Sequence, residues 1–307
     1  MGWLFLCPAI AYGGEMHLFE PQCVAPTSCL LGQSPVWSPS EGLLWWVDPN
    51  RAKLHRYNPK TGNARRYDLP LKASVIALSQ GELLMAGEQE IGFFDPSTEE
   101  YTRLAKLDGE PEGNRINAGG VAPDGSFWFV TMDGNEADAR SAWYRLTPDR
   151  QIHPLNVKPV VIPSTASFSP DGSTFYTCDT TEQEIHAFDV EAGERLTNRR
   201  IFTTTSSGAG YPDGSTIDSE GYLWNAEWDG ARIVRYSPEG AVDRTIKLPV
   251  SRITGCCFGD RDLKTLYVTT ARTGLTSFQM DMQPFAGSLF AIATDIQGRP
   301  CGEWSGR

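Results

Sequence analysis

Six times along this chain of 307 residues, a turn precedes a short apolar run, and a second short run follows it. The period is roughly 40–48 residues, the range expected of a propeller blade. The first runs are LWW at 44–46, LLM at 83–85, FWF at 127–129, TFY at 174–176, LWN at 223–225 and LYV at 266–268. The second runs are HRYNP at 55–59, GFFDP at 92–96, WYRLTP at 143–148, HAFD at 186–189, VRYSP at 234–238 and, less clearly, SLFA at 288–291.

These runs are too short for helices and are rich in aromatic and β-branched residues, so they predict strands. Four of the six turns contain Asp-Gly or Glu-Gly, in which glycine supplies the positive φ of a tight hairpin. Each repeat therefore predicts an antiparallel meander, and four such strands make one propeller blade. An irregular sandwich or barrel is the alternative, but three aligned features recurring six times disfavour it. The expected fold is an all-β, six-bladed β-propeller of four-stranded antiparallel blades.

Each blade of such a ring buries its faces only against its neighbours, so the repeats predict a single domain over residues 28–307. Residues 1–27 are expected to be an N-terminal extension or a segment that closes the ring. The apolar start lacks a Lys or Arg before its apolar run, so it is a poor signal peptide, and it is too short to span a bilayer.

The formal net charge of −11 disfavours nucleic acid and anionic membrane surfaces as partners, because both attract basic proteins. The cysteines are odd in number, seven, and no Cys-x-x-Cys pair occurs. Neither a zinc knuckle nor a disulfide framework is therefore indicated. Free buried thiols in a cytoplasmic protein are the expectation.

Several motifs along the chain resemble the gluconolactonase/regucalcin (senescence marker protein) family. They are LGQSPVW at 31–37, RIN at 115–117, APDGSFWFVTM at 122–132, SFSPDG at 167–172, YPDG at 211–214, IDSEGYLW at 217–224, CCFG at 256–259 and LYVTTAR at 266–272. The resemblance implies a six-bladed propeller that holds one divalent cation on its axis. In the family that cation serves hydrolysis of sugar lactones or related esters.

The resemblance also implies which residues form the site. The three metal-binding positions of the family, which carry Glu, Asn and Asp, fall on Gln33, Ser164 and Asp213. The substrate-side Arg and Asn fall on Arg115 and Asn117, whereas the acidic neighbour at position 118 is replaced by alanine. Only Asp213 of the three metal ligands is unchanged.

Calcium and magnesium prefer anionic oxygens, and their affinity follows the ligand charge. Replacing Glu by Gln33 removes one charge, and Ser164 has a shorter reach than Asn. We therefore expect a divalent cation (Ca, Mg, Zn, Mn or Fe) to bind weakly or not at all. Gln33 and Ser164 also have a purely structural interpretation, as hydrogen-bond partners of neighbouring backbone, and Asp213 could be a turn residue of Pro-Asp-Gly.

The residues leave three functions open. The first is a lactonase-like hydrolase in which Asp213 is the general base and Arg115 and Asn117 hold the substrate or its oxyanion. In this hydrolase Gln33 and Ser164 either bind a weakly held metal or donate hydrogen bonds to the substrate in its place. The second is a metal-independent isomerase, lyase or cyclase that uses Asp213 as acid or base. The third is a propeller that binds a small molecule without catalysis.

Two further residues are candidates for the same pocket. Glu227 follows an apolar run and would raise the pKa of Asp213 if the two carboxylates were close. Trp228 is suited to stack on a sugar ring. A small molecule is the expected partner, and the resemblance favours a monomer or weak dimer.

Overall fold

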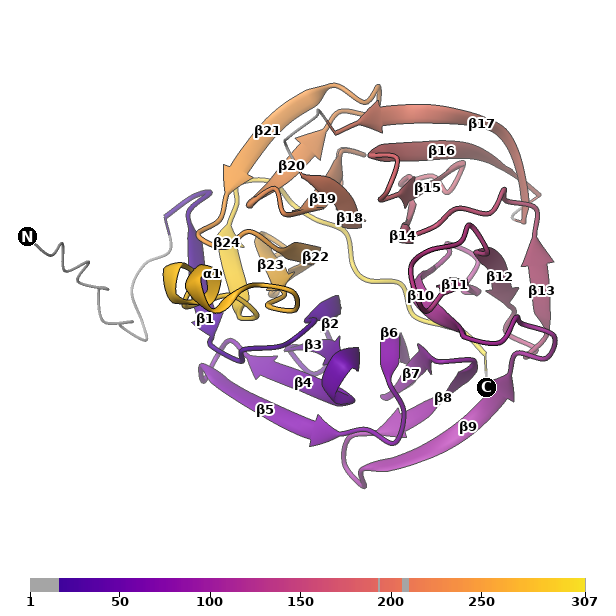
Figure 1. The fold of residues 1–307 in the computed structure, drawn as a ribbon, viewed down its shortest axis with the longest axis horizontal. Helices are drawn as coiled ribbons and strands as arrows, with labels where there is room; N and C mark the ends of the chain where they lie inside the picture. The colour runs from indigo at the N-terminus through magenta and orange to yellow at the C-terminus, as the bar shows by residue number, and fades with distance from the viewer. Residues whose placement is uncertain (1–16, 193, 206–209, 307) are drawn as a thin grey trace, which may run out of the picture.

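The computed structural model describes residues 17–192, 194–205 and 210–306, which form six antiparallel sheets arranged in a ring (Figure 1). The first three blades consist of β2 (Gln33–Ser38), β3 (Leu43–Asp48), β4 (Lys53–Asn58) and β5 (Asn63–Asp68); β6 (Ala73–Ser79), β7 (Glu82–Gly87), β8 (Glu90–Asp95) and β9 (Glu100–Lys106); and β10 (Asn114–Val121), β11 (Phe127–Asp133), β12 (Ala142–Leu146) and β13 (Ile152–Leu155). The fourth and fifth consist of β14 (Pro163–Phe168), β15 (Thr174–Asp179), β16 (Glu184–Glu191) and β17 (Arg195–Thr204); and β18 (Tyr211–Ile217), β19 (Leu223–Trp228), β20 (Arg232–Tyr236) and β21 (Val242–Lys247). The sixth consists of β22 (Ile253–Gly259), β23 (Thr265–Thr270), β24 (Leu289–Ala293) and β1 (Pro21–Ala25).

The predicted six-bladed propeller of four-stranded antiparallel blades is confirmed. Every one of the six apolar triplets lies in the second strand of its blade, and every following run overlaps the third. The second strands are the most deeply buried, because both of their faces pack against neighbouring blades. In β3 all six residues are buried, and β11 and β23 are likewise buried throughout.

The ring is closed by pairing between the two ends of the chain. Strand β1 forms the outer strand of the sixth blade and pairs antiparallel with β24, with Gln22 opposite Ala291. The chain then enters the first blade through residues 27–32. Residues 1–16 lie outside the described part of the chain.

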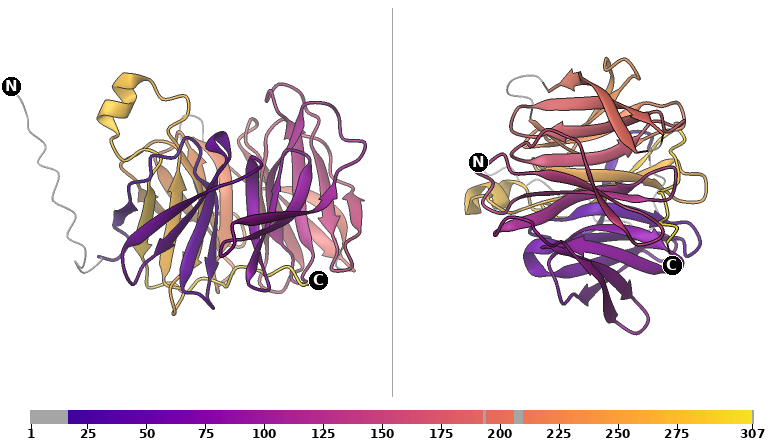
Figure 2. Two further views of the ribbon diagram at one scale, coloured as in Figure 1. Left: turned by 90° about the horizontal axis from the view of Figure 1, so that it is seen from below. Right: turned by 90° about the vertical axis from the view of Figure 1, so that its right-hand side faces the viewer.

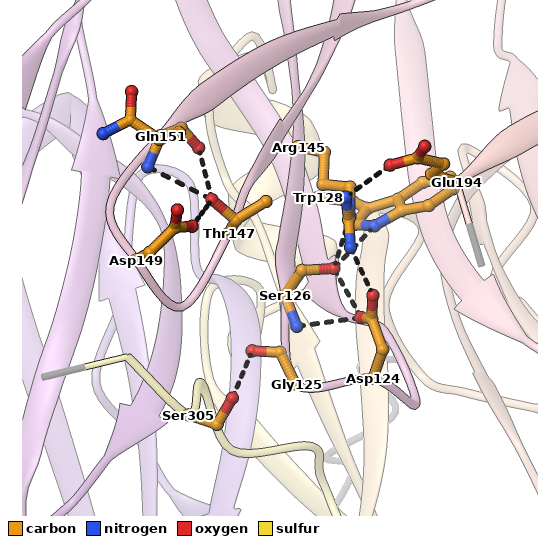
Figure 3. Close-up of polar contacts among 10 residues, drawn as sticks. All are labelled: Asp124, Gly125, Ser126, Trp128, Arg145, Thr147, Asp149, Gln151, Glu194 and Ser305. Carbon is orange, nitrogen blue, oxygen red and sulfur yellow. Dashed lines mark hydrogen bonds and ion pairs between the residues drawn. The ribbon is translucent and has the colours of Figure 1, made fainter. Parts of the chain in front are cut away.

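A tryptophan–arginine pair recurs between the second and third strands of alternate blades. The register pairs Trp45 with Arg56, Trp128 with Arg145 and Trp224 with Arg235. In the third blade both side chains donate to the hydroxyl of Ser126, and Arg145 also pairs with Glu194 of the next blade at 2.8 Å (Figure 3).

In the fifth blade the shared acceptor of the tryptophan and the arginine is a buried carboxylate. Trp224 Nε1 and Arg235 Nε each donate to Oδ2 of Asp218, both at 2.8 Å. Arg235 is itself buried and also pairs with Glu220 and Asp243. We call each such group, the tryptophan, the arginine and their shared acceptor, a corner cluster. It ties the turn between the first and second strands to the body of the blade.

The C-terminal segment crosses the ring on the face opposite the short helix α1 (Ser277–Met282), as Figure 2 shows. Gly298 pairs with Asp218, and Trp304 N donates to the carbonyl oxygen of Leu78 at 2.9 Å. Ser305 reaches Gly125 at the turn of the third blade (Figure 3). The side chain of Trp304 is fully buried. We call the α1 side the upper face and the side crossed by this tail the lower face.

Helical structure is sparse in the described residues. Besides α1, which begins at a capping box formed by Thr276 and Gln279, a single 3-10 turn, η1 (Pro49–Arg51), follows β3. None of the helices in the described part of the chain has the length and apolar character that crossing a bilayer requires.

Candidate functional site

Each innermost strand carries an irregularity near its upper end. The pairing register shifts between Gln33 and Val36 in β2, and equivalent shifts occur in the other five inner strands. They lie at 73–75 in β6, 116–118 in β10, 164–167 in β14, 212–215 in β18 and 253–255 in β22. A bulge of this kind re-aims the side chains beside it. Six bulges around one axis therefore present one set of side chains to the same space.

That set is a ring of polar residues, which we call the axial ring. Its members, one from each blade in chain order, are Gln33, Ser74, Asn117, Ser164, Asp213 and Thr254, and all of them line one cavity of about 760 Å³ on the axis. Asp213 is the single acid among the six. The predicted metal-site residues Gln33, Ser164 and Asp213 and the predicted substrate residues Arg115 and Asn117 therefore share this cavity.

The carboxylate of Asp213 is held by groups that lock its position. Ser164 Oγ donates to Oδ1 at 2.6 Å. The main-chain oxygen of Asp213 accepts from Thr165 Oγ1 at 2.6 Å and from Asn225 Nδ2 at 2.8 Å. Burial raises the pKa of Asp213 to about 7, although hydrogen bonds from Ser164 and the Gly214 amide act in the opposite direction.

Arg115 and Asn117 form a connected pair on β10. Arg115 Nη1 donates to Asn117 Oδ1 at 2.6 Å, and Asn117 Nδ2 donates to the carbonyl oxygen of Pro163 in the next blade at 2.8 Å. Glu136, in the loop after β11, pairs with Arg115 at 3.3 Å and also lines the cavity. Burial lowers the pKa of Arg115, and the charge of Glu136 acts against this effect.

Gln33 and Ser164 use their donors within the protein. Gln33 Nε2 donates to the carbonyl oxygen of Ser74 at 2.6 Å, on the neighbouring blade, while the Ser164 hydroxyl proton is directed at Asp213. The side chain amide of Gln33 therefore joins two blades, as the structural interpretation expected, and it does so at the wall of the cavity.

The structure separates the two remaining candidates. Trp228 lines the cavity, and the guanidinium of Arg252 lies 4.8 Å from the centre of its ring. Glu227 instead is fully buried within the fifth blade, where it pairs with Arg232 at 2.6 Å and lies 3.3 Å from the hydroxyl of Tyr236. Its register partner is Pro212 rather than Asp213, and successive side chains of a strand point to opposite faces.

Sequence reasoning missed the residues that hold Asp213 through its main chain. Thr165 has a φ of 62°, which is strained for a β-branched residue, and its hydroxyl contacts both Asp213 and Ser215. The only sequence signal for such a role is that Thr165 follows a site residue directly, as Ser34, with a φ of 53°, follows Gln33.

The family to which this site belongs follows from comparison of the whole sequence. The family model described as the SMP-30/Gluconolactonase/LRE-like region matches residues 31–272, which include every member of the axial ring. The chain belongs to the SMP-30/gluconolactonase family.

Relatives within the SMP-30/gluconolactonase family align along nearly the full chain. Regucalcin of Oryctolagus cuniculus is 34% identical over 302 residues, which cover 95% of this chain and 100% of that protein. L-arabinolactonase of Azospirillum brasilense is 32% identical over 288 residues, which cover 92% of this chain and 95% of that protein. A solved structure of regucalcin, a calcium-binding protein of Agrobacterium tumefaciens, superposes with a TM-score of 0.88 at 27% identity and covers 94% of this chain and 97% of that chain.

Proposed function

We propose that this protein hydrolyses a sugar lactone or a related small cyclic ester in the axial cavity, with Asp213 as the general base. Relatives that align over nine tenths of the chain include L-arabinolactonase and the 6-deoxy-6-sulfogluconolactonase of Pseudomonas putida. The observation that carries the proposal is the placement of Asp213. It is the single carboxylate of the axial ring, it is fixed by Ser164, and its pKa lies near neutrality.

The geometry supports a direct attack of water on the lactone carbonyl. Asp213 removes a proton from the water while the water oxygen bonds to the carbonyl carbon. The guanidinium of Arg115, held by Asn117, stabilises the negative charge that develops on the carbonyl oxygen. The ring C–O bond then breaks, and the proton on Asp213 passes to the departing oxygen, which yields an open-chain hydroxy acid.

The axial ring is a poor donor set for a hard divalent cation. It offers one carboxylate, and the hydroxyl proton of Ser164 is already committed to that carboxylate. Calcium sites draw their affinity from several anionic oxygens, so the ring has too little charge for tight binding. We therefore propose that catalysis depends weakly, or not at all, on an axial metal.

The test is a turnover assay with five- and six-membered aldonolactones, in which hydrolysis is measured through the protons that it releases. Heat-denatured protein is the blank for spontaneous hydrolysis. Asp213→Asn should lower kcat/KM by about 10²-fold or more, because it removes the base without changing the volume. Asp171→Asn is the matched control, since Asp171 also stands between a proline and a glycine, but in a hairpin turn away from the axial ring. Equal loss in the two variants, or no turnover of any aldonolactone by folded protein, would reject the hydrolase.

A second candidate is a metal-independent isomerisation, elimination or cyclisation at the same carboxyl. A group that titrates near pH 7 can donate a proton as readily as it accepts one, and the pKa of Asp213 is about 7. The discriminating result is a product that has gained no water, detected by mass spectrometry, whose formation survives chelator and disappears in Asp213→Asn. Thermal stabilisation by lactones without any product would instead indicate a binding protein.

Cys29, Cys178, Cys256, Cys257 and Cys301 carry free thiols. This supports a reducing compartment, and we propose the cytoplasm as the location of the protein.

A further inference from the structure

Away from the axial cavity, three potential metal ligands meet in the first blade. Cys29 lies in the loop before β2, Asp48 is the last residue of β3, and His55 lies in β4. One ligand atom from each falls within 4.8 Å of the other two, and all three side chains are buried. Trp46 stacks on the imidazole with 5.0 Å between ring centres.

This cluster sits at the joint where the ring closes. The loop that carries Cys29 is bound by its backbone to the sixth blade, because Cys29 N donates to the carbonyl oxygen of Gly287 at 2.7 Å and Leu31 pairs with Ala271. Asp48 and His55 belong to the first blade. Any ion held by all three side chains would therefore link the last blade to the first.

The spacing of the sulfur and nitrogen atoms suits a shared tetrahedral ion. Cys29 Sγ lies 3.5 Å from His55 Nε2. Zinc–sulfur and zinc–nitrogen bonds of about 2.3 Å and about 2.0 Å at a tetrahedral angle place the two ligand atoms about 3.5 Å apart. The hydroxyl of Thr27 lies 3.4 Å from the same sulfur and donates to the carbonyl oxygen of Gly287 at 3.0 Å, which ties the loop of Cys29 to the sixth blade.

The charges of the cluster also balance a divalent ion. Asp48 accepts from the amides of Leu30 at 2.8 Å and Leu31 at 3.2 Å, but within the described residues no lysine or arginine forms an ion pair with it. By contrast, Asp133 ends the equivalent strand of the third blade and pairs with Arg140. A zinc ion with the carboxylate of Asp48 and the thiolate of Cys29 is neutral, and a neutral centre is far less costly to bury than an unpaired charge.

We propose that Cys29, Asp48 and His55 bind a zinc ion that fastens the first blade to the sixth. Zinc is the ion that combines thiolate, imidazole and carboxylate ligands in a tetrahedral structural site. Because the ligands are buried, the ion enters while the chain folds.

The test is expression of the full chain in defined medium supplemented with zinc or cobalt. Zinc-grown protein should contain about one zinc ion per chain, and X-ray absorption should report one sulfur ligand at about 2.3 Å. Cobalt-grown protein should show a near-ultraviolet thiolate-to-cobalt charge-transfer band. Cys29→Ser should abolish the band, whereas Cys178→Ser, which alters a buried thiol beside Asp213 at the axial ring, should retain it.

Zinc-grown protein should also melt several degrees above protein grown without zinc, because the ion binds only the folded state. Wild-type protein that lacks the cobalt band, or zinc that has only nitrogen and oxygen neighbours, overturns the proposal. These readouts need only the wild type, so they hold even where Cys29→Ser fails to fold. They are also independent of lactone turnover.

Discussion

The hydroxyl of Ser164 donates a hydrogen bond of 2.6 Å to Oδ1 of Asp213, across the boundary between the fourth and fifth blades. This bond favours the ionised form of the carboxyl, whereas burial favours the neutral form. The pKa of the proposed base is therefore a balance between the packing of two blades and one hydroxyl.

Removing that hydroxyl should shift the pH profile. In Ser164→Ala the carboxylate of Asp213 loses a donor, so its pKa should rise by about 0.5 to 1 unit. The acidic limb of kcat/KM should move to higher pH by the same amount, as measured with a lactone substrate in buffers of constant ionic strength. Ser167→Ala, which removes a buried hydroxyl bonded to the backbone of Ser215, is the control and should leave the limb in place. A limb that does not move in Ser164→Ala would show that a group other than Asp213 titrates there.

Restoring charge to the axial ring should restore calcium binding. The double variant Gln33→Glu with Ser164→Asn raises the ring from one carboxylate to two and returns a longer oxygen ligand. Calcium affinity measured by calorimetry should rise at least about tenfold over the wild type. Gln151→Glu, an added acid at an exposed turn of the lower face, is the control for net charge. Wild-type affinity equal to that of the double variant would contradict a charge-poor ring.

The stability of the protein should depend on the ionisation of Asp213. Its folded pKa of about 7 lies above the unfolded value, so the wild type loses stability as pH rises from about 4 to about 7. Asp213→Asn cannot ionise and should become more stable than the wild type over this range, by about 2 to 4 kcal/mol above pH 7. Urea unfolding at a series of pH values measures the difference.

Asp171→Asn should behave in the opposite sense. Hydrogen bonds from Ser169 and Ser173 lower the pKa of Asp171 to about 2, so its carboxylate stabilises the fold above about pH 4, and that stability is lost as pH falls toward about 2. The variant should therefore be less stable than the wild type at neutral pH. If both Asn variants followed the same trend, burial would not be the cause of the shift at Asp213.

The corner cluster of the fifth blade should be a major source of stability. Arg235→Met leaves the fully buried carboxylate of Asp218 without its cation, and this should cost about 3 to 5 kcal/mol in the free energy of unfolding. Arg56→Met is the matched control at the same strand position in the first blade. Arg56 is half-buried and lies 5.7 Å from the centre of the Trp45 ring, so its loss should cost about 1 kcal/mol or less. Equal losses would mean that packing of the arginine stem, rather than the buried ion pairs, stabilises the corner.

The blades were predictable because their signals are local. A glycine turn followed by LWW or FWF specifies a hairpin and a buried second strand without reference to the rest of the chain. The axial residues Gln33, Ser164 and Asp213 were found through resemblance to relatives, since nothing in their spacing shows that they meet.

What remained hidden depends on pairing between strands. The six bulges that aim side chains at the axis are set by register, and so is the direction of Glu227, which pairs opposite Pro212 and turns toward Arg232. The positive φ of Thr165 likewise lies within the bulge of β14, where the hydroxyl of Thr165 bonds to the next blade. Such features are properties of assembled sheets and leave little trace in composition or periodicity.

The tail that crosses the lower face changes what the central channel is. Arg299, Cys301 and Glu303 line the far end of the axial cavity, and Trp304 anchors the segment beneath the second and third blades. These tail residues therefore occupy the lower end of the cavity, which an open circle of blades would leave to solvent. In the proposed reaction we expect substrate and product to share the opening at the upper face, so that slow release of the acid would delay entry of the next lactone.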